Sequence, residues 1–164
     1  MALRTADLLD AHDDQLRLGQ LRVVAPMFKS YGKRHAFHGT ISTLKIFEDN
    51  SLVRKAVEQP GNGHVLVIDG GGSMRCALVG DQLAQLAVNN GWAGLVVYGC
   101  VRDSRALADM EIGIFSLGTH PLKTIKRNTG EVDIPVCFGG VTFVPGQYLY
   151  ADADGVIVSV SALN

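Results

Sequence analysis

Apolar runs and helix-like repeats alternate through the middle of the chain. The run HVLVIDGGG, residues 64–72, is almost continuously apolar and ends in glycines, which is typical of a strand buried on both faces. The segment GDQLAQLAVNNG, residues 80–91, repeats its apolar positions at a spacing of three and four and predicts a helix. The run GLVVYGCV, residues 94–101, predicts a second buried strand. These segments form a strand–helix–strand unit whose two strands are expected to be parallel.

Capping residues suggest where the helices begin and end. Asp81 is a candidate N-cap of the central helix, and Gly91 is a candidate for the position just after its end. The segment TADLLDAHDD predicts a short helix with Thr5 as a possible N-cap. The segment EDNSLVRKAVEQPG predicts another, which Asn50 or Ser51 begins. The segment STLKIF before it predicts a strand.

The last third of the chain predicts mainly strands. The segment ALADMEIGIFSLG, residues 106–118, indicates a helical turn followed by a strand. Turns are expected at residues 128–130, 139–140, 145–146 and 154–155, each of which ends in glycine. No linker or internal repeat divides the sequence. We therefore expect one α/β domain over residues 1–164, with a strand–helix–strand core and an additional C-terminal β layer.

Composition narrows the class of protein. The 164 residues are 47% apolar, enough for one good core, and the formal net charge of −1 provides no basic surface for nucleic acid or for a membrane. No run of 18 apolar residues predicts a membrane-spanning helix, and the acidic N-terminus does not resemble a signal peptide. Cys76, Cys100 and Cys137 are scattered and odd in number, as expected for reduced, mostly buried thiols in a cytoplasmic protein.

Three segments with candidate chemistry follow or precede the predicted strands. They are Asp69–Gly72 after the first strand, Gly80–Leu83 at the start of the helix, and Arg102–Asp103 after the second strand. Ligands of parallel α/β proteins collect at the carboxyl ends of strands and at the helix N-termini that face them. We therefore expect the three segments to meet at one edge of the sheet.

The residue types of these segments suit a small oxo-acid and a metal ion. The free N–H groups of Gln82 and Leu83 favour an anion, and the Arg102 guanidinium matches a carboxylate. The carboxylates of Asp81 and Asp103 offer hard oxygens to a divalent cation such as Mg²⁺, which would keep several waters. The residues alone leave a plainer alternative open, in which Asp81 is only an N-cap and Arg102–Asp103 a solvated loop.

Longer stretches carry a resemblance to a known family. The segments are VLVIDGGGSMRCALVGDQLAQLAVNNGWAGLVVYG followed by VRD, then FGGVTFVPGQYLYADADGVIVS, with KIFEDN upstream. They resemble the RraA-like family, which includes the regulator of ribonuclease E activity and the class II 4-hydroxy-4-methyl-2-oxoglutarate (HMG) aldolases. The resemblance runs over nearly the whole chain. It implies a swivelling β/β/α-like fold assembled as a homotrimer or as a hexamer of two trimers.

Catalytic members of that family share an acid, twenty intervening residues and an Arg-Asp pair. Asp81, residues 82–101 and Arg102–Asp103 match this pattern. Members with only the regulatory role tend to lack the final aspartate, so its presence favours an enzyme. The resemblance implies that Asp103 binds Mg²⁺ or Mn²⁺, partly through water, and that Asp81 holds the waters of the metal. It also implies that a neighbouring subunit can supply an acid, which we do not match to a residue of this chain.

The implied reaction is the cleavage of HMG to two pyruvates. The substrate carboxylate would lie at Gly80, Asp81, Gln82 and Leu83, and Arg102 would stabilise the enolate oxygen of pyruvate. Decarboxylation of oxaloacetate would pass through the same pyruvate enolate, and neither reaction needs a lysine Schiff base. The alternative from another class is a protein that binds RNase E or its partners and inhibits RNA processing.

Other motifs favour plainer interpretations. The segment GGGSMR matches neither phosphate-binding glycine motif, which argues against a nucleotide site and against an S-adenosylmethionine methyltransferase. His35 and His38 lie three apart in a strand-like segment and so on opposite faces, which disfavours zinc. For Asp69, a turn cap and a role in the site remain equally open. A surface ion pair is the favoured interpretation of Arg75, and Ser73 and Cys100 lack the partners of a nucleophile.

Overall fold

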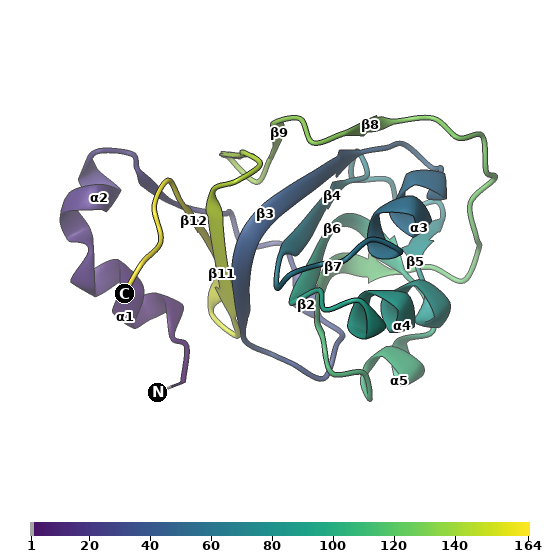
Figure 1. Ribbon diagram of the computed structural model, residues 1–164, viewed down its shortest axis with the longest axis horizontal. Helices are drawn as coiled ribbons and strands as arrows, with labels where there is room; N and C mark the ends of the chain where they lie inside the picture. Colours follow the sequence, from purple (N-terminus) through teal and green to yellow (C-terminus); the bar gives the residue numbers. More distant parts are fainter. Residues whose placement is uncertain (1) are drawn as a thin grey trace.

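The computed structural model of the protein describes residues 2–164 as an α/β fold built on a mixed sheet (Figure 1). The helices are α1 (Thr5–Ala11), α2 (Asp13–Arg17), α3 (Ser51–Val57), α4 (Asp81–Asn89) and α5 (Ser104–Leu107). The strands are β1 (Leu21–Val23), β2 (Lys29–Ser30), β3 (Phe37–Lys45), β4 (Val65–Asp69), β5 (Ala77–Val79), β6 (Gly94–Val101), β7 (Gly113–Thr119), β8 (Glu131–Val132), β9 (Val136–Phe138), β10 (Val141–Phe143), β11 (Tyr148–Asp152) and β12 (Gly155–Ser159).

The centre of the fold is the parallel sheet that the apolar runs predict. Strands β3, β4, β6 and β7 pair in parallel in that order, and β6 spans the same residues, 94–101, as the sequence prediction. The parallel strand–helix–strand unit is therefore confirmed. Strand β5, which also pairs with β6 in parallel, was not predicted, because three apolar residues are too few to indicate a strand by pattern. This short strand brings the chain back to the edge where β6 ends.

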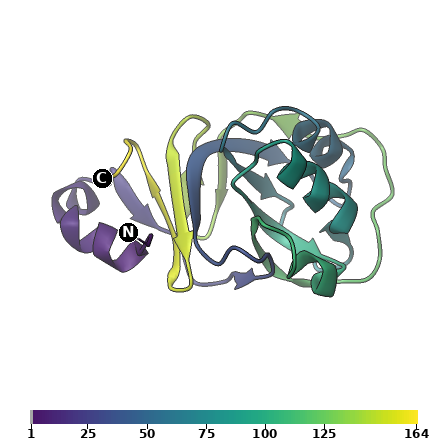
Figure 2. The same cartoon turned by 60° about the horizontal axis from the view of Figure 1, so that its bottom comes forward.

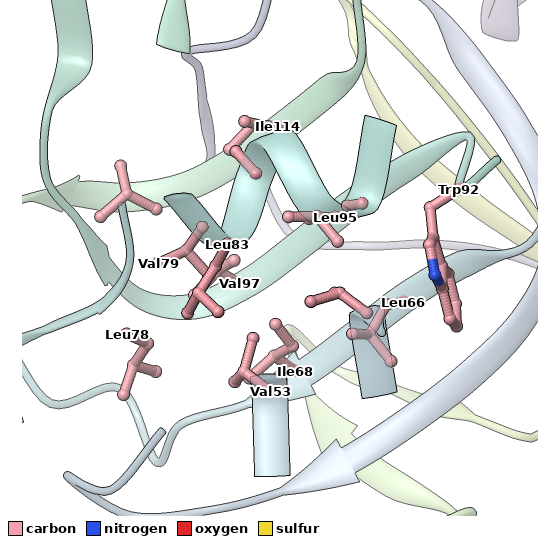
Figure 3. Packing of buried hydrophobic residues seen from close by; sticks show 14 of the residues in the cluster. Val53, Leu66, Ile68, Leu78, Val79, Leu83, Trp92, Leu95, Val97 and Ile114 are labelled. Carbon is pink, nitrogen blue, oxygen red and sulfur yellow. The ribbon is translucent and has the colours of Figure 1, made fainter. Parts of the chain in front are cut away.

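Alternate side chains of β4 and β6 face two different cores. Leu66, Ile68, Leu95 and Val97 pack toward α3 and α4, as Figure 3 shows. Their neighbours Val65, Val67 and Val96 pack instead against strands from the C-terminal third of the chain. Both faces of the sheet are covered, which explains the continuous apolar runs. The result is the β/β/α layering that the resemblance to the RraA-like family implied.

Strand β3 joins the two β layers. It pairs in parallel with β4 through its second half and antiparallel with β11 through its first half, so β11, β12 and β1 continue the same hydrogen-bonded sheet. Helices α1 and α2 cover the outer side of this C-terminal layer, where Leu8 and Leu9 pack on Tyr150 and Ile157. The two chain ends lie close together there, on the side away from α3 and α4 (Figure 2).

The predicted helix starts need two corrections. Helix α1 begins at Thr5 after Arg4 as N-cap, because the Thr5 hydroxyl is committed to Asp152 Oδ1, 2.7 Å away. Helix α4 has Gly80 as N-cap, so Asp81 is its first helical residue and does not cap it. Asn50 does precede α3, and Gly91 follows α4 with φ of +80°, as predicted. No helix among residues 2–164 is long and apolar enough to cross a membrane.

Candidate functional site

The ends of β5 and β6 bring Asp81 and Asp103 together. Because the two strands pair, the Arg102 N–H donates to the Val79 carbonyl at 2.9 Å, and the residues that follow each strand become neighbours. The Asp81 N–H then donates to Asp103 Oδ2 at 3.0 Å. This N–H is one of the donors that the first turn of a helix leaves without an internal partner. The Asp103 carboxylate thus takes over the capping role expected of the Asp81 side chain.

Asp103 holds this position through an uncommon backbone conformation. Its φ of 59° and ψ of 40° are left-handed, and its carbonyl accepts the Leu107 N–H at 3.0 Å to begin α5. Left-handed non-glycine residues are uncommon, although aspartate tolerates the conformation better than most. On the other side, Gly80 leaves the carboxylate just enough room, since a Cβ at residue 80 would lie 2.6 Å from Asp103 Oδ2. Both features fix where the carboxylate lies.

A cavity of about 170 Å³ opens at this edge of the sheet. The residues to which the sequence assigns substrate binding, metal binding or catalysis all line it: Gly80, Asp81, Gln82, Leu83, Arg102 and Asp103. The N-terminus of α4 faces it, and its first N–H is the one bound to Asp103, so the N–H groups of Gln82 and Leu83 remain for a ligand. The cavity therefore combines an anion-binding helix end with two carboxylates and a guanidinium.

The Arg102 side chain hydrogen-bonds a backbone carbonyl instead of pairing with a carboxylate. Its Nη1 lies 3.4 Å from the Pro121 carbonyl, a long hydrogen bond. Within residues 2–164, no carboxylate lies within ion-pair distance of the guanidinium. The side chain is half-buried, which leaves most of its donors directed at the cavity or at solvent. It can therefore bind a ligand oxygen without first breaking an ion pair.

Sequence reasoning missed four polar or charged residues that line the cavity: Asn50, Arg54, Lys123 and Lys126. Asn50 and Arg54 come from the start of α3, and the two lysines from the long connection between β7 and β8. The lysines lie 20 and 23 residues beyond Asp103 in a segment without a recognisable motif. The one usable signal was KIFEDN, whose Asp49 and Asn50 hold that connection in place.

Asp49 is a buried carboxylate that binds the segment carrying the lysines. Its Oδ2 accepts the Arg127 N–H at 2.9 Å and the Thr129 N–H at 3.1 Å, while Oδ1 accepts the Ser51 N–H at 3.0 Å. Burial alone would raise the pKa of this carboxyl, but the hydrogen bonds from Ser51, Thr129 and Arg127 outweigh burial and hold the pKa well below its ordinary value. Asp49 is therefore an ionised structural anchor.

The glycine turn after β4 does not join the site. Residues 69–72 are absent from the cavity lining, which corrects the expectation that three segments meet. Asp69 Oδ1 accepts the Gly71 N–H at 2.9 Å, and the Gly70 and Gly72 N–H groups both donate to the Tyr98 carbonyl at 3.1 Å. Because these three glycine N–H groups are all hydrogen-bonded within the chain, the turn has none of them free to bind a phosphate or a substrate. Of the two interpretations left open for Asp69, the structure favours the turn cap.

The remaining candidates also take structural roles. Arg75 forms an exposed ion pair with Glu48. His35 bonds to the Ser30 hydroxyl, whereas His38 stacks on Tyr150 at 5.6 Å between ring centroids, so the two histidines do not form a metal site together. Burial raises the pKa of the Cys100 thiol, which disfavours the thiolate that a nucleophile needs.

The carboxylates of Asp81 and Asp103 suit a hard divalent cation. Among residues 2–164, no three His, Cys, Asp or Glu side chains gather closely enough to hold a metal by themselves. Residues 2–164 therefore do not by themselves provide the three or more protein ligands of a typical zinc or calcium site. Asp81 and Asp103 line one cavity. Of the carboxylate oxygens of these two residues, only Asp103 Oδ2 has a hydrogen-bond partner within the described chain. Such a pair suits Mg²⁺ or Mn²⁺, which bind through one or two carboxylates and complete their shell with water and substrate.

Comparisons with known sequences give consistent results. The sequence profile of a family described as RraA-like (Aldolase/RraA) matches residues 5–158. A relative from Aromatoleum aromaticum is 63% identical over 163 residues, which is 99% of each chain. Another from Dechloromonas aromatica is 59% identical over 164 residues, which is 100% of each chain. Both relatives carry the provisional name 4-hydroxy-4-methyl-2-oxoglutarate aldolase.

Two solved structures have nearly the same fold. One, from Geobacillus kaustophilus, is described as S-adenosylmethionine:2-dimethylmenaquinone methyltransferase; it is 47% identical, covers 98% of this chain and 96% of its own, and superposes with a TM-score of 0.92. The other is the RNA-processing inhibitor RraA from Thermus thermophilis, at 44% identity, 98% and 94% coverage and a TM-score of 0.91. One fold thus carries three different functional descriptions, so function must be argued from the site.

Proposed function

The chain belongs to the RraA-like family, and on that premise we propose that it is a divalent-metal-dependent lyase. It cleaves 4-hydroxy-4-methyl-2-oxoglutarate to two pyruvates and also decarboxylates oxaloacetate. The observation that carries the proposal is the contact between the Asp81 N–H and Asp103 Oδ2, at the edge of a cavity that Arg102 also lines. The provisional aldolase name of relatives up to 63% identical supports the same activity.

The reaction breaks the bond between C3 and C4 of the substrate. The electron pair of that bond moves into the 2-oxo group and generates the enolate of the first pyruvate, while the C4 hydroxyl loses its proton and becomes the ketone of the second. The enolate then takes a proton at C3. Oxaloacetate reaches the same enolate when its C4 carboxylate leaves as carbon dioxide.

Each site residue has a role in this scheme. The N–H groups of Gln82 and Leu83, at the positive end of α4, bind the carboxylate next to the ketone. Arg102 donates to the oxygen on which the enolate charge develops. Asp103 and Asp81 would hold the divalent cation, directly and through water. When bound, that cation acts as a Lewis acid toward the same developing charge.

The test measures pyruvate formed from HMG and from oxaloacetate, with Mg²⁺ or Mn²⁺ and with EDTA. We expect two pyruvates per HMG consumed and loss of turnover when EDTA removes the metal. Turnover of oxaloacetate alone would leave a decarboxylase whose main substrate is a different 2-oxo acid. Absence of turnover on both above the background of the free metal would contradict the lyase proposal.

A second candidate function rests on the 44% identity to the RNA-processing inhibitor RraA. In this alternative the chain, as a trimer or hexamer, binds an RNase E-type protein and inhibits RNA processing through surface contacts. Direct binding of purified RNase E and inhibition of its cleavage of RNA would support it. The Asp103→Asn variant separates the two functions, since only the lyase activity depends on that carboxylate.

A further inference from the structure

A second cavity, of about 350 Å³, lies toward the amino ends of β4 and β6. Its lining includes Leu44 and Leu66, each 1% exposed, so it reaches the main apolar core. Trp92, just before β6, belongs to the same lining, and Figure 3 shows its ring beside Leu66 at the far end of the core from Val79. The cavity proposed for the lyase reaction opens instead where β5 and β6 end, and the two cavities share no lining residue. The second cavity is therefore a separate site.

Hydrogen bonds and close packing hold the Trp92 wall of the second cavity in place. The indole Nε1–H donates to the Gln59 carbonyl at 3.1 Å. A Cβ at residue 61 would lie 2.6 Å from Trp92 Cγ, so Gly61 allows the turn after α3 to pack directly on the ring. Asn90 Nδ2 also donates to the Val57 carbonyl at 2.8 Å and ties the end of α4 to the end of α3. A wall that is already ordered lowers the entropic cost of binding a ligand.

Strand β8 forms the opposite wall and is fixed to β3. Val132 pairs with Leu44, and the Asp133 N–H donates to the Thr43 carbonyl at 3.0 Å. The Thr43 hydroxyl donates in turn to the Ile134 carbonyl at 2.5 Å. Although β8 has only two residues, these bonds give the cavity a defined shape on this side.

Ser42 and His64 add one polar pair to this lining, and neither has a role in the lyase scheme. The Ser42 hydroxyl lies 2.9 Å from His64 Nδ1. When the hydroxyl donates this bond, the neutral imidazole carries its proton on Nε2, which has no hydrogen-bond partner within residues 2–164. The imidazole also lies edge to face with Trp92, with 6.4 Å between ring centroids. A hydrogen-bond donor thus lies beside an aromatic wall, which suits an oxygen atom attached to an aromatic ring.

The charges around the second cavity are balanced. Its lining includes one cation, Lys55, and one carboxylate, Asp133, and neither forms an ion pair in the part of the chain that the structure describes. The cavity proposed for the lyase reaction has four cationic side chains and two carboxylates. Because moving a charge from water to an apolar site is costly without a net opposite charge, the second cavity favours an uncharged ligand.

We propose that the second cavity binds an uncharged, hydroxylated aromatic compound of one or two rings. The ring packs against Trp92 and the apolar side chains that reach the core, and its hydroxyl oxygen accepts a hydrogen bond from His64 Nε2. The volume of about 350 Å³ falls within the range of roughly 300–1,000 Å³ that is usual for small-molecule pockets. This site goes beyond the proposed lyase function and does not depend on it.

The single tryptophan of the chain provides a direct readout, because Trp92 lines the cavity. Protein labelled with 5-fluorotryptophan has one fluorine NMR signal, and titration with 2-naphthol should shift it with a Kd of about 0.1–1 mM. Calorimetry should give the same Kd. Two matched compounds test the chemistry: decahydro-2-naphthol lacks the aromatic faces, and 2-naphthoate carries a charge. Each should bind at least about fivefold more weakly than 2-naphthol.

Two variants test the site and a third is the control. Ala56→Leu adds side-chain volume to the lining and should abolish binding of 2-naphthol. His64→Phe keeps a ring of similar size but removes the donor, and should weaken binding about fivefold. His38→Phe, at an exposed position outside the cavity, should leave the affinity unchanged.

Three results would overturn the proposal. One is a fluorine signal that does not move up to the solubility limit of 2-naphthol, which is also the result expected if another copy of the chain covers the cavity in the assembled protein. Another is equal affinity for the three compounds. The third is undiminished binding by both Ala56→Leu and His64→Phe, each shown by thermal unfolding to be folded.

Discussion

The backbone N–H of Asp81 donates to the carboxylate of Asp103, 3.0 Å away and 22 residues further along the chain. This bond ties the N-terminus of α4, where a substrate carboxylate would bind, to the acid that would hold the metal. Neither residue could be misplaced without disturbing the other.

Gly80→Ala should displace the Asp103 carboxylate without unfolding the protein. The added Cβ would lie 2.6 Å from Asp103 Oδ2, yet the Gly80 φ of −125° is acceptable for alanine. We expect kcat/KM on HMG to fall by about 10- to 100-fold, since displacement of a catalytic group by about 1 Å has such effects. Steady-state kinetics and thermal unfolding measure the two properties.

Gly140→Ala serves as a control, because a Cβ there meets no atom and the residue lies outside the cavity. Its positive φ of +77° should lower the stability without changing kcat/KM at a temperature where the protein is folded. Full activity of Gly80→Ala would show that the position of the Asp103 carboxylate is not critical.

Arg102→Lys should remove most of the activity even though the charge is retained. A lysine ammonium is a single point charge and cannot present the planar fork of a guanidinium to the enolate oxygen. We expect kcat to fall by about 100-fold or more, with a smaller change in KM. Turnover close to that of the wild-type protein would rule out the role assigned to Arg102.

Asp49 should make the folded state sensitive to acid. Because its pKa is lower in the folded than in the unfolded chain, its contribution to stability is complete above about pH 4, the ordinary pKa of aspartate, and is lost as the pH falls toward the folded-state pKa. Asp152, whose pKa is also lowered against the effect of burial by hydrogen bonds from Thr5 and Asp154, acts in the same direction. Urea unfolding from pH 7 to pH 3 should show this loss.

Asp49→Asn should reduce both the stability and its slope with pH. The amide presents an N–H₂ group to backbone donors, so we expect a loss of about 1–3 kcal/mol at pH 7 and a smaller further loss in acid. Asp10→Asn, an exposed acid, is the control and should leave both quantities nearly unchanged. A variant with the wild-type slope would contradict the role of Asp49 as an ionised anchor.

Thr5→Val should loosen the N-terminal helices from the C-terminal β layer. The Thr5 N–H and hydroxyl both bind the buried Asp152 carboxylate, at 2.6 and 2.7 Å, and valine keeps the shape but removes the hydroxyl. We expect the free energy of unfolding to fall by about 1–3 kcal/mol, because a buried carboxylate oxygen loses a donor. Thr119→Val, at an exposed strand position, should have no comparable effect in the same denaturant titration.

The sequence predicted those parts of the molecule that local pattern determines. Buried strands such as β4 and β6 reveal themselves by continuous apolar runs, and Gly91 marks the end of α4 by its left-handed backbone. The sequence pattern did not predict features that depend on hydrogen bonds between residues of different elements. Asp81 looked like an N-cap, but Asp103 fulfils that role from another element, and the glycine turn at residues 69–72 closes on Tyr98 instead of reaching the site.

The lysine side of the cavity could not be predicted for the same reason. Lys123 and Lys126 lie in a segment without periodicity, and their place depends on Asp49 and Asn50, more than seventy residues earlier in the chain. Spacing rules describe neighbours within one element or one strand–helix–strand unit. They do not describe a side chain that fixes a distant connection.

Pyruvate release from HMG by the wild-type protein and by Asp103→Asn, each in saturating Mg²⁺, tests the central claim most directly. The substitution keeps the size of the side chain and one oxygen that can still accept the Asp81 N–H, so the fold should survive while the charge that holds the cation is lost. The lyase account predicts two pyruvates per HMG for the wild-type protein and at least a 100-fold lower kcat/KM for the variant, or about 2.7 kcal/mol of transition-state stabilisation. Equal rates for the two proteins would contradict it.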